Sequence, residues 1–196
     1  MAALLGSGRS GERGNLVQLL NNNYTVSMTT RWLTPEELRA WRSYLAASWL
    51  LEDAIDRQLQ QEAGMPHLYY SVLANLSEAP DHRMRMTDLA EALKITRSRL
   101  TYAVTRLEKD GTVRREGCPT DKRGSVAILT EDGRALLERT APGHVETVRS
   151  AVFDHLTEEQ VAQLEAICSR ITEALQQDEE RSACGELPWR RRSSTP

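Results

Sequence analysis

The chain has few cysteines, few aromatic residues and no long apolar run. Its 196 residues include 3 Cys, and aromatic residues make up 5%. No stretch approaches the roughly 20 apolar residues that a membrane-spanning helix requires, so we expect no membrane segment. Residues 1–5 lack the basic start and the long apolar stretch of a secretory signal. We therefore expect a cytoplasmic protein.

The sequence also lacks the patterns of common catalytic and metal sites. It contains no Gly-rich phosphate loop, no nucleophile elbow and no His-Glu-x-x-His helix. The cysteines show no Cys-x-x-Cys spacing, and the 4 His residues lie far apart in the chain. We predict that the protein is not an enzyme and holds no metal or cofactor.

The stretch from Met86 to Gly133 carries the most specific pattern in the chain. Thr87 is the expected N-cap of a short helix, and Thr96 is the expected N-cap of a second helix over residues 97–110. Gly111 supplies the left-handed residue that commonly ends a helix. Apolar residues recur along the second helix at a 3.6-residue period and predict its buried face: Leu100, Ala103, Val104 and Leu107. This is a helix-turn-helix pattern.

The outer side of the second helix carries hydroxyl, guanidinium and phenol groups. Arginine binds guanine O6 and N7 bidentately, while serine and threonine donate to phosphate or contact a thymine methyl. A solvated helix face has a similar composition, so the helix alone leaves both interpretations open. The candidate DNA-contacting residues are Arg97, Ser98, Arg99, Thr101, Tyr102, Thr105 and Arg106.

A hairpin follows the second helix and favours the DNA-binding interpretation. Residues 112–116 and 125–129 are predicted to form two strands. The turn between these strands carries Asp121, Lys122 and Arg123. Cations at a projecting tip suit the negative potential of a DNA minor groove.

Charge is distributed unevenly along the chain. Residues 94–125 contain nine Lys or Arg against four Asp or Glu, although the net charge of the chain is −3. Residues 157–180 contain one Arg against seven acids. One basic module in a mildly acidic protein is typical of DNA-binding proteins.

These motifs together resemble the winged-helix core of the MarR family of transcription regulators. The resemblance covers residues 34–176 and implies a mostly α fold with a small β-hairpin wing. It also implies a winged helix-turn-helix core flanked by dimerisation helices from both termini. In the wing, the resemblance assigns Asp121 to orienting the basic tip and Arg123 to reaching the minor groove. The matching segments are Leu89–Leu93, Thr96–Ser98, Leu107–Gly111, Asp121–Arg123 and Leu129–Gly133.

Two capping boxes frame the flanking helices. Thr34-Pro35-Glu36-Glu37 predicts the start of a long helix, and Thr157-Glu158-Glu159-Gln160 predicts the start of another. Because the stripes of both helices are too apolar to expose, we expect a two-fold homodimer. The predicted organisation is a flexible leader (1–28), dimerisation helices (34–64 and 140–176), a winged-helix DNA-binding domain (65–139) and a disordered tail (177–196).

A small-molecule effector follows from the resemblance rather than from a motif. Relatives of this type respond to small aromatic or phenolic compounds held between the dimer helices and the winged core. Core packing explains the candidate residues equally well. The candidate ligand-binding residues are Trp41, Tyr44, Trp49, His67 and Tyr70.

The sequence thus predicts a dimeric repressor that binds a pseudo-palindromic DNA site and is modulated by a small aromatic ligand. One alternative is a helical protein-interaction dimer whose winged helix does not bind DNA. Another is a redox-sensing regulator, because Cys118 lies among cations that lower a thiol pKa.

Overall fold

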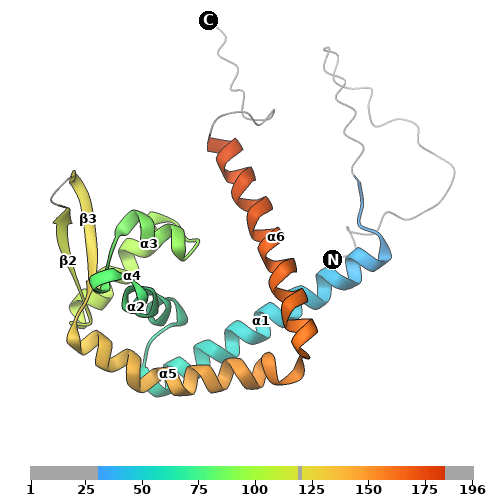
Figure 1. Cartoon of the computed structure of the whole chain (residues 1–196), viewed down its shortest axis with the longest axis horizontal. Helices are drawn as coiled ribbons and strands as arrows, with labels where there is room; N and C mark the ends of the chain where they lie inside the picture. Colours follow the sequence, from blue (N-terminus) through green and yellow to red (C-terminus); the bar gives the residue numbers. More distant parts are fainter. Residues whose placement is uncertain (1–30, 119–120, 184–196) are drawn as a thin grey trace, which may run out of the picture. The chain divides into compact units, whose positions relative to one another are not determined.

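The computed structural model describes residues 31–118 and 121–183, and in these ranges it leaves out the side chains of residues 118, 121–123 and 179–183. The fold is mostly helical with a small antiparallel sheet, as the sequence predicts (Figure 1). The elements are α1 (Pro35–Ala63), α2 (His67–Glu78), η2 (Pro80–His82), β1 (Arg83–Arg85), α3 (Met86–Ala92), α4 (Arg97–Lys109), β2 (Val113–Cys118), β3 (Asp121–Leu129), α5 (Glu131–Ala151), η3 (Phe153–His155) and α6 (Glu158–Ala183).

Helix α1 begins and ends as its sequence signals indicate. The Thr34 amide donates to Glu37 Oε2 at 2.8 Å, and the Glu37 amide donates back to Thr34 Oγ1 at 3.2 Å. This reciprocal pair is the capping box. At the other end Gly64 has φ of 63°, a conformation that a side chain disfavours. The chain divides into two compact units within α1, after Leu50.

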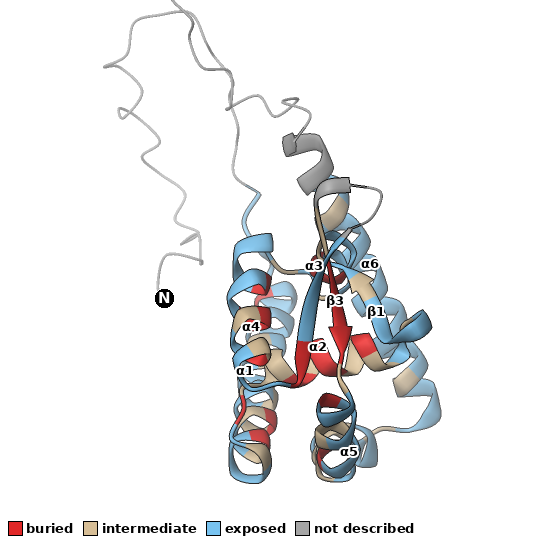
Figure 2. Ribbon diagram, turned by 90° about the vertical axis from the view of Figure 1, so that its left-hand side faces the viewer, coloured by how far each residue is buried: buried red, intermediate tan, exposed pale blue. Residues whose placement is uncertain are grey.

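The apolar core of the second unit lies where α2, α3, α4 and the sheet meet. The α4 residues that the helical period assigns to the core are all buried, which confirms that prediction. Figure 2 shows buried residues concentrated along β3 and α2. Fully burying each such aliphatic side chain stabilises the fold by about 1.5 to 3 kcal/mol. The largest fully buried side chains are Leu59, Val72, Leu73, Leu76, Leu89, Leu100, Val104, Val113 and Thr140.

The sheet has three strands in the order β1-β3-β2, and both pairings are antiparallel. The hairpin of β2 and β3 is the predicted wing, with Val113 opposite Leu129. Strand β1 was not predicted, because three residues with one apolar position give too little alternation to detect. It pairs with β3 through Arg83 opposite Ile128 and Arg85 opposite Val126. The winged core therefore has strands on both edges of β3.

The starts of α3 and α4 differ in how they are capped. Thr96 is the N-cap of α4, and its Oγ1 accepts from the Arg99 amide at 3.3 Å, as predicted. The prediction for Thr87 is wrong, because α3 already begins at Met86 and Thr87 lies in its first turn. The Thr87 hydroxyl instead donates to Asp88 Oδ1 at 2.8 Å.

Helix α6 is longer than the sequence predicts, and helix α5 contains an internal proline. Helix α5 runs without interruption through Pro142. Helix α6 continues to Ala183, so residues 177–183 are helical rather than part of the tail. Its last residues are mostly Gln, Glu, Arg and Ala, which have good helix propensity despite their charge. The rest of the tail and the leader lie outside the described residues.

Gly133 is the glycine whose replacement should cost most. A Cβ built there would lie 2.1 Å from the Thr112 carbonyl oxygen, whereas one built at Gly117 would meet nothing within 4 Å. We expect Gly133→Ala to lower the free energy of unfolding by about 1 to 3 kcal/mol. The matched variant Gly117→Ala should stay within about 0.5 kcal/mol of the wild type. Urea denaturation measures both, and equal effects would contradict this account of Gly133.

Candidate nucleic-acid interface

The outer face of α4 is the centre of the candidate interface. Of the seven residues predicted on it, only Thr105 is half-buried and the other six are exposed. Tyr102 is 75% exposed although it is aromatic. Arg97 and Arg99 make no ion pair within the described part of the chain. Two guanidinium groups and a phenol are therefore presented to solvent from one rigid helix.

Two of the predicted residues are already engaged within α4. The Thr101 hydroxyl donates to the Arg97 carbonyl oxygen at 2.8 Å, which turns its donor away from an incoming ligand. Arg106 forms an ion pair with Asp110 at 3.4 Å. The helix thus offers its unpaired cations at the N-terminal end and a neutralised pair at the C-terminal end.

A basic hollow of about 280 Å³ lies beside the N-terminal end of α4. Its lining comes from β1, from the starts of α3 and α4, and from the two wing strands β2 and β3. Sequence patterns did not single out Arg85, Arg115 or Ser125, because these residues are dispersed among short strands and only the sheet brings them together. The lining residues are Arg85, Met86, Thr87, Arg97, Thr101, Arg115, Gly124 and Ser125.

The wing is joined to α4 through Arg115 and Glu108. The Arg115 amide donates to Glu108 Oε1 at 2.9 Å, and its Nε donates to Glu108 Oε2 at 2.6 Å. Because both the backbone and the side chain of Arg115 are held, strand β2 has a fixed position against the helix.

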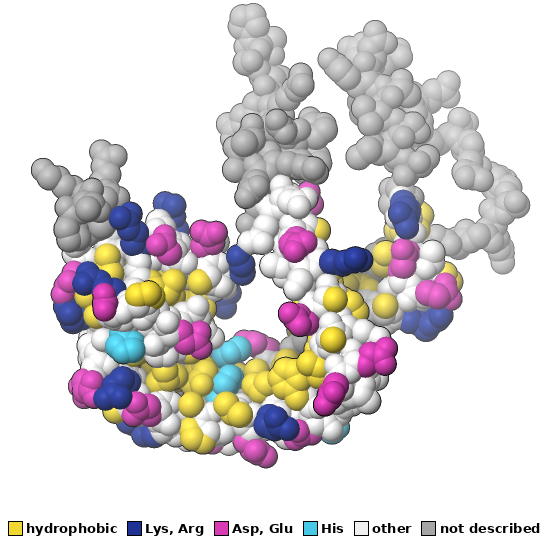
Figure 3. Space-filling model, in the orientation of Figure 1, with side chains coloured by type: hydrophobic (Ala, Val, Ile, Leu, Met, Phe, Trp, Pro, Cys, Tyr) yellow, Lys and Arg dark blue, Asp and Glu magenta, His cyan; other side chains and the backbone are white. Residues whose placement is uncertain are grey.

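The wing tip carries the other predicted DNA contacts. Asp121, Lys122 and Arg123 open β3, and the Cα of Asp121 is the partner of Cys118 after a register shift at Gly117. Their side chains, and that of Cys118, lie outside what the structure describes. Below the tip, Lys and Arg side chains lie close to the wing at the left edge of Figure 3.

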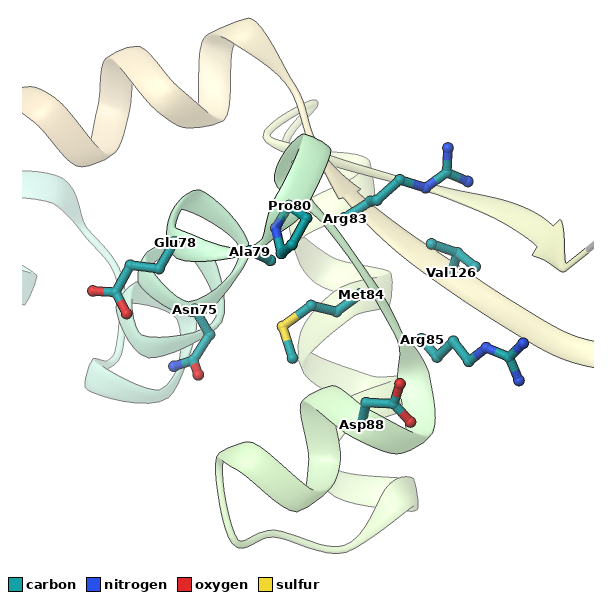
Figure 4. A pocket seen from close by; sticks show the side chains of 9 residues that line it. All are labelled: Asn75, Glu78, Ala79, Pro80, Arg83, Met84, Arg85, Asp88 and Val126. Atoms are coloured by element: carbon teal, nitrogen blue, oxygen red, sulfur yellow. The ribbon is translucent and has the colours of Figure 1, made fainter.

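A second groove, of about 550 Å³, lies between the end of α2, β1 and α3. Figure 4 shows Met84 pointing to one side of β1, and Arg83 and Arg85 pointing to the other. Asn75 and Glu78 of α2 line the side that Met84 faces. Arg83 forms an ion pair with Glu116 at 3.8 Å, so its charge is directed to the wing.

The predicted ligand residues are distributed over two helices, α1 and α2. Trp41 and Tyr44 stack with ring centroids 6.0 Å apart on α1, and both are exposed, as is Trp49. His67 and Tyr70 are on α2, with Tyr70 buried and His67 half-buried.

The structure adds His144 of α5 to the α2 group. The His144 ring lies 4.3 Å from that of Tyr70 and 5.8 Å from that of His67. Its Nδ1 atom is buried and has no hydrogen-bond partner among the described residues. Burial, and to a lesser degree the neighbouring His67, lower the pKa of His144. Burial and the nearby Glu78 carboxylate raise the pKa of the Tyr70 phenol. No sequence motif connects His144 with Tyr70 and His67, which lie 74 and 77 positions earlier in the chain.

The lowered pKa of His144 predicts a pH-dependent stability. As the pH falls below the ordinary histidine pKa of about 6.5, the unfolded chain binds this proton before the folded chain does. The contribution of His144 to the stability of the fold is therefore fully present above that pH. It decreases as the pH falls towards the lower pKa of His144 in the folded state. We expect His144→Phe to reduce this loss, measured by urea denaturation across the pH range. The exposed His155 is the matched position, and an equal change in His155→Phe would contradict the prediction.

A helix with an exposed, arginine-bearing outer face, a basic hollow beside it and a two-stranded wing define a winged helix-turn-helix protein. A family model described as "MarR family" matches residues 63–124. Sco3205 from Streptomyces coelicolor, a MarR family transcriptional regulator solved in complex with DNA, is 60% identical. The match covers 75% of this chain and 92% of that chain, with a TM-score of 0.74. AbsC, another MarR family regulator of Streptomyces coelicolor, is 41% identical over 75% of this chain and 99% of its own, with a TM-score of 0.72.

The protein belongs to the MarR family. Among curated proteins, the transcriptional repressor YetL of Bacillus subtilis is 34% identical over 50% of this chain, and the chain spans 58% of the length of YetL. Membership in a family of transcriptional regulators confirms the expectation that the chain is not an enzyme. None of the helices in the described ranges has the length and apolar character that crossing a bilayer requires.

Proposed function

We propose that the protein is a dimeric DNA-binding transcription regulator that represses genes from a pseudo-palindromic site. The observation that carries this proposal is the outer face of α4. Arg97, Arg99 and Tyr102 are exposed there on a helix whose opposite face is fixed in the core. Guanidinium groups of this kind read guanine in the major groove, which is wide enough to admit a helix.

The relatives support this proposal. Sco3205, at 60% identity, was crystallised in complex with DNA. YetL is a repressor, which favours repression over activation here. A repressor of this kind works on DNA in the cytoplasm, in agreement with the expected location.

The homodimer is supported by the exposed apolar stripe of α6. Four aliphatic residues recur along this helix at helical spacing, and each keeps a large exposed fraction within the described residues. Each square ångström of such surface removed from water contributes about 25 cal/mol to association. A two-fold axis would present two copies of α4 to successive major grooves, about 34 Å apart. The stripe consists of Leu164, Ile167, Ile171 and Leu175, which are 38%, 56%, 43% and 62% exposed.

The proposal also includes a small aromatic effector, which two groups of aromatic side chains support. The exposed Trp41–Tyr44 pair offers ring surface for stacking. The His67, Tyr70 and His144 rings offer polar groups beside apolar surface. Both groups combine the flat contact surface and the donors that a phenolic compound requires.

Two arginine substitutions distinguish base reading from backbone contact. Arg99→Ala should weaken binding by about 1 to 3 kcal/mol and relax the preference at one base position. Arg123→Ala should weaken binding to all DNA sequences. It should also make the binding constant less dependent on salt concentration, by the amount expected for the loss of about one phosphate contact. Fluorescence anisotropy with DNA duplexes at several salt concentrations measures both effects.

The matched control for these variants is Arg134→Ala. Arg134 is an exposed arginine on α5 that pairs with Glu131 and Glu138 and does not line the basic hollow. It should bind DNA like the wild type. If all three variants bound equally well, α4 and the wing would not be the DNA-binding surface.

A charge in the α6 stripe should separate the dimer. Ile171→Asp buries a carboxylate in the proposed interface, so sedimentation velocity should show a monomer at micromolar concentration. Affinity for a full two-half site should fall at least about tenfold, because the two half-sites are then bound independently. Glu173→Ala, on the same helix, should remain dimeric. A dimeric Ile171→Asp variant would place the interface elsewhere.

A further inference from the structure

The C-terminal end of α4 is held by an unusually dense set of hydrogen bonds. The Thr112 amide and the Thr112 hydroxyl both donate to the Leu107 carbonyl oxygen, at 3.0 and 3.1 Å. Gly111 has φ of 75°, and its amide donates to the Glu108 carbonyl oxygen at 3.1 Å. Thr112 is only 6% exposed, so this polar turn lies inside the fold.

The same turn is bonded to the start of α5. The Thr130 amide donates to the Thr112 carbonyl oxygen at 3.1 Å, and the Thr130 hydroxyl donates to the Gly111 carbonyl oxygen at 2.8 Å. The Thr130 hydroxyl also accepts from the Gly133 amide at 3.1 Å, which caps α5. The Thr130 side chain therefore bonds both to the turn that follows α4 and to the first turn of α5.

The close approach at this point depends on Gly133. Any Cβ there would overlap the Thr112 carbonyl oxygen, a backbone atom that cannot turn aside as a side chain can. One turn earlier on α4, Glu108 holds Arg115 of β2 through both carboxylate oxygens. The end of α4 is thus bonded to α5 on one side and to the wing on the other. We call this set the α4 joint: Glu108, Thr112, Arg115, Thr130 and Gly133.

We infer that Thr130 and Glu108 are positioning residues that set the angle of α4 against α5 and against the wing. This inference rests on the proposed function. Neither residue belongs to the outer face of α4, and a carboxylate at Glu108 would repel DNA phosphates rather than bind them. The bonds of Glu108 to Arg115 account for its presence on a helix that reads DNA.

The angle at the α4 joint has a geometric consequence in a dimer. Helix α5 leads from the winged core to α6, whose stripe forms the proposed interface. The joint therefore contributes to the distance between the two copies of α4, and so to the spacing of the two half-sites. Base preference within one half-site depends instead on the side chains of α4. Weakening the α4 joint should let the dimer accept a wider range of half-site spacings, while the base preference within each half-site stays unchanged.

Selection from a pool of random DNA duplexes tests this separation. The wild-type protein, Thr130→Val and Thr130→Ser are each used to select bound duplexes, and the half-site bases and spacings are counted. The valine variant keeps the shape of Thr130 but loses the bonds to Gly111 and Gly133, while the serine variant keeps the hydroxyl. We expect Thr130→Val to lose about tenfold in discrimination between the preferred spacing and spacings one base pair away. Its base preference should match the wild type, and Thr130→Ser should match it in both respects.

Glu108→Gln tests the wing side of the joint, where β2 pairs with β3 and β3 leads into Thr130 and α5. It should also relax spacing, because the charge-assisted bond to the Arg115 side chain is lost. Asp110→Asn is the matched control for spacing, since this substitution removes the same charge at the C-cap of α4, and Asp110 pairs only with Arg106 among the described ion pairs. Thermal melting identifies a temperature at which every variant is folded.

Three results would overturn an assignment. Wild-type spacing in both Thr130→Val and Glu108→Gln would show that the joint does not position α4. An equal loss of spacing and base preference would show a general loss of structure. A wild-type protein that selects no sequence at all would refute the proposed function itself, before the joint is tested.

Discussion

The buried apolar face of α4 is the constraint on which the candidate interface depends. Leu100, Val104 and Leu107 pack against α2, α3 and β2, so the helix cannot rotate about its axis without exposing them. Because residues on the two faces of a helix are related by a fixed period, this packing decides which side chains face outward. The position of Arg97 and Arg99 is therefore a result of hydrophobic burial several ångströms away, and no polar contact is required to present them.

Sequence patterns predicted those parts of the fold that follow from local rules. The capping boxes at Thr34 and Thr157, the cap at Thr96 and the left-handed Gly111 depend on residues within one turn of each other. Helical periodicity is equally local, and it gave the whole buried face of α4. Strand β1 and the true start of α3 were missed because each depends on pairing with β3, which lies about 40 residues further along the chain.

The candidate site was predictable to the same extent. The outer face of α4 followed from the period, but the partners of its residues did not. The Arg106–Asp110 pair has the i,i+4 spacing that a helix brings together, so it could have been predicted. The bond of Arg115 to Glu108 depends instead on side-chain reach between two elements. The grouping of His144 with Tyr70 depends on the packing of α5 against α2. Composition and spacing contain no information about such contacts between distant residues.

Under the proposed function, the ion pair at the end of α4 has a consequence for encounters with DNA that the protein does not recognise. Before Arg106 can bind a phosphate it must leave Asp110, and the carboxylate then faces the same negative backbone. A surface pair of this kind is worth only about 0.2 to 1 kcal/mol, so a well-aligned site overcomes it easily. A poorly aligned duplex gains less from the exchange and is released sooner. In the proposed regulator, Asp110 would thus shorten the time spent on the wrong sequences during the search for a site.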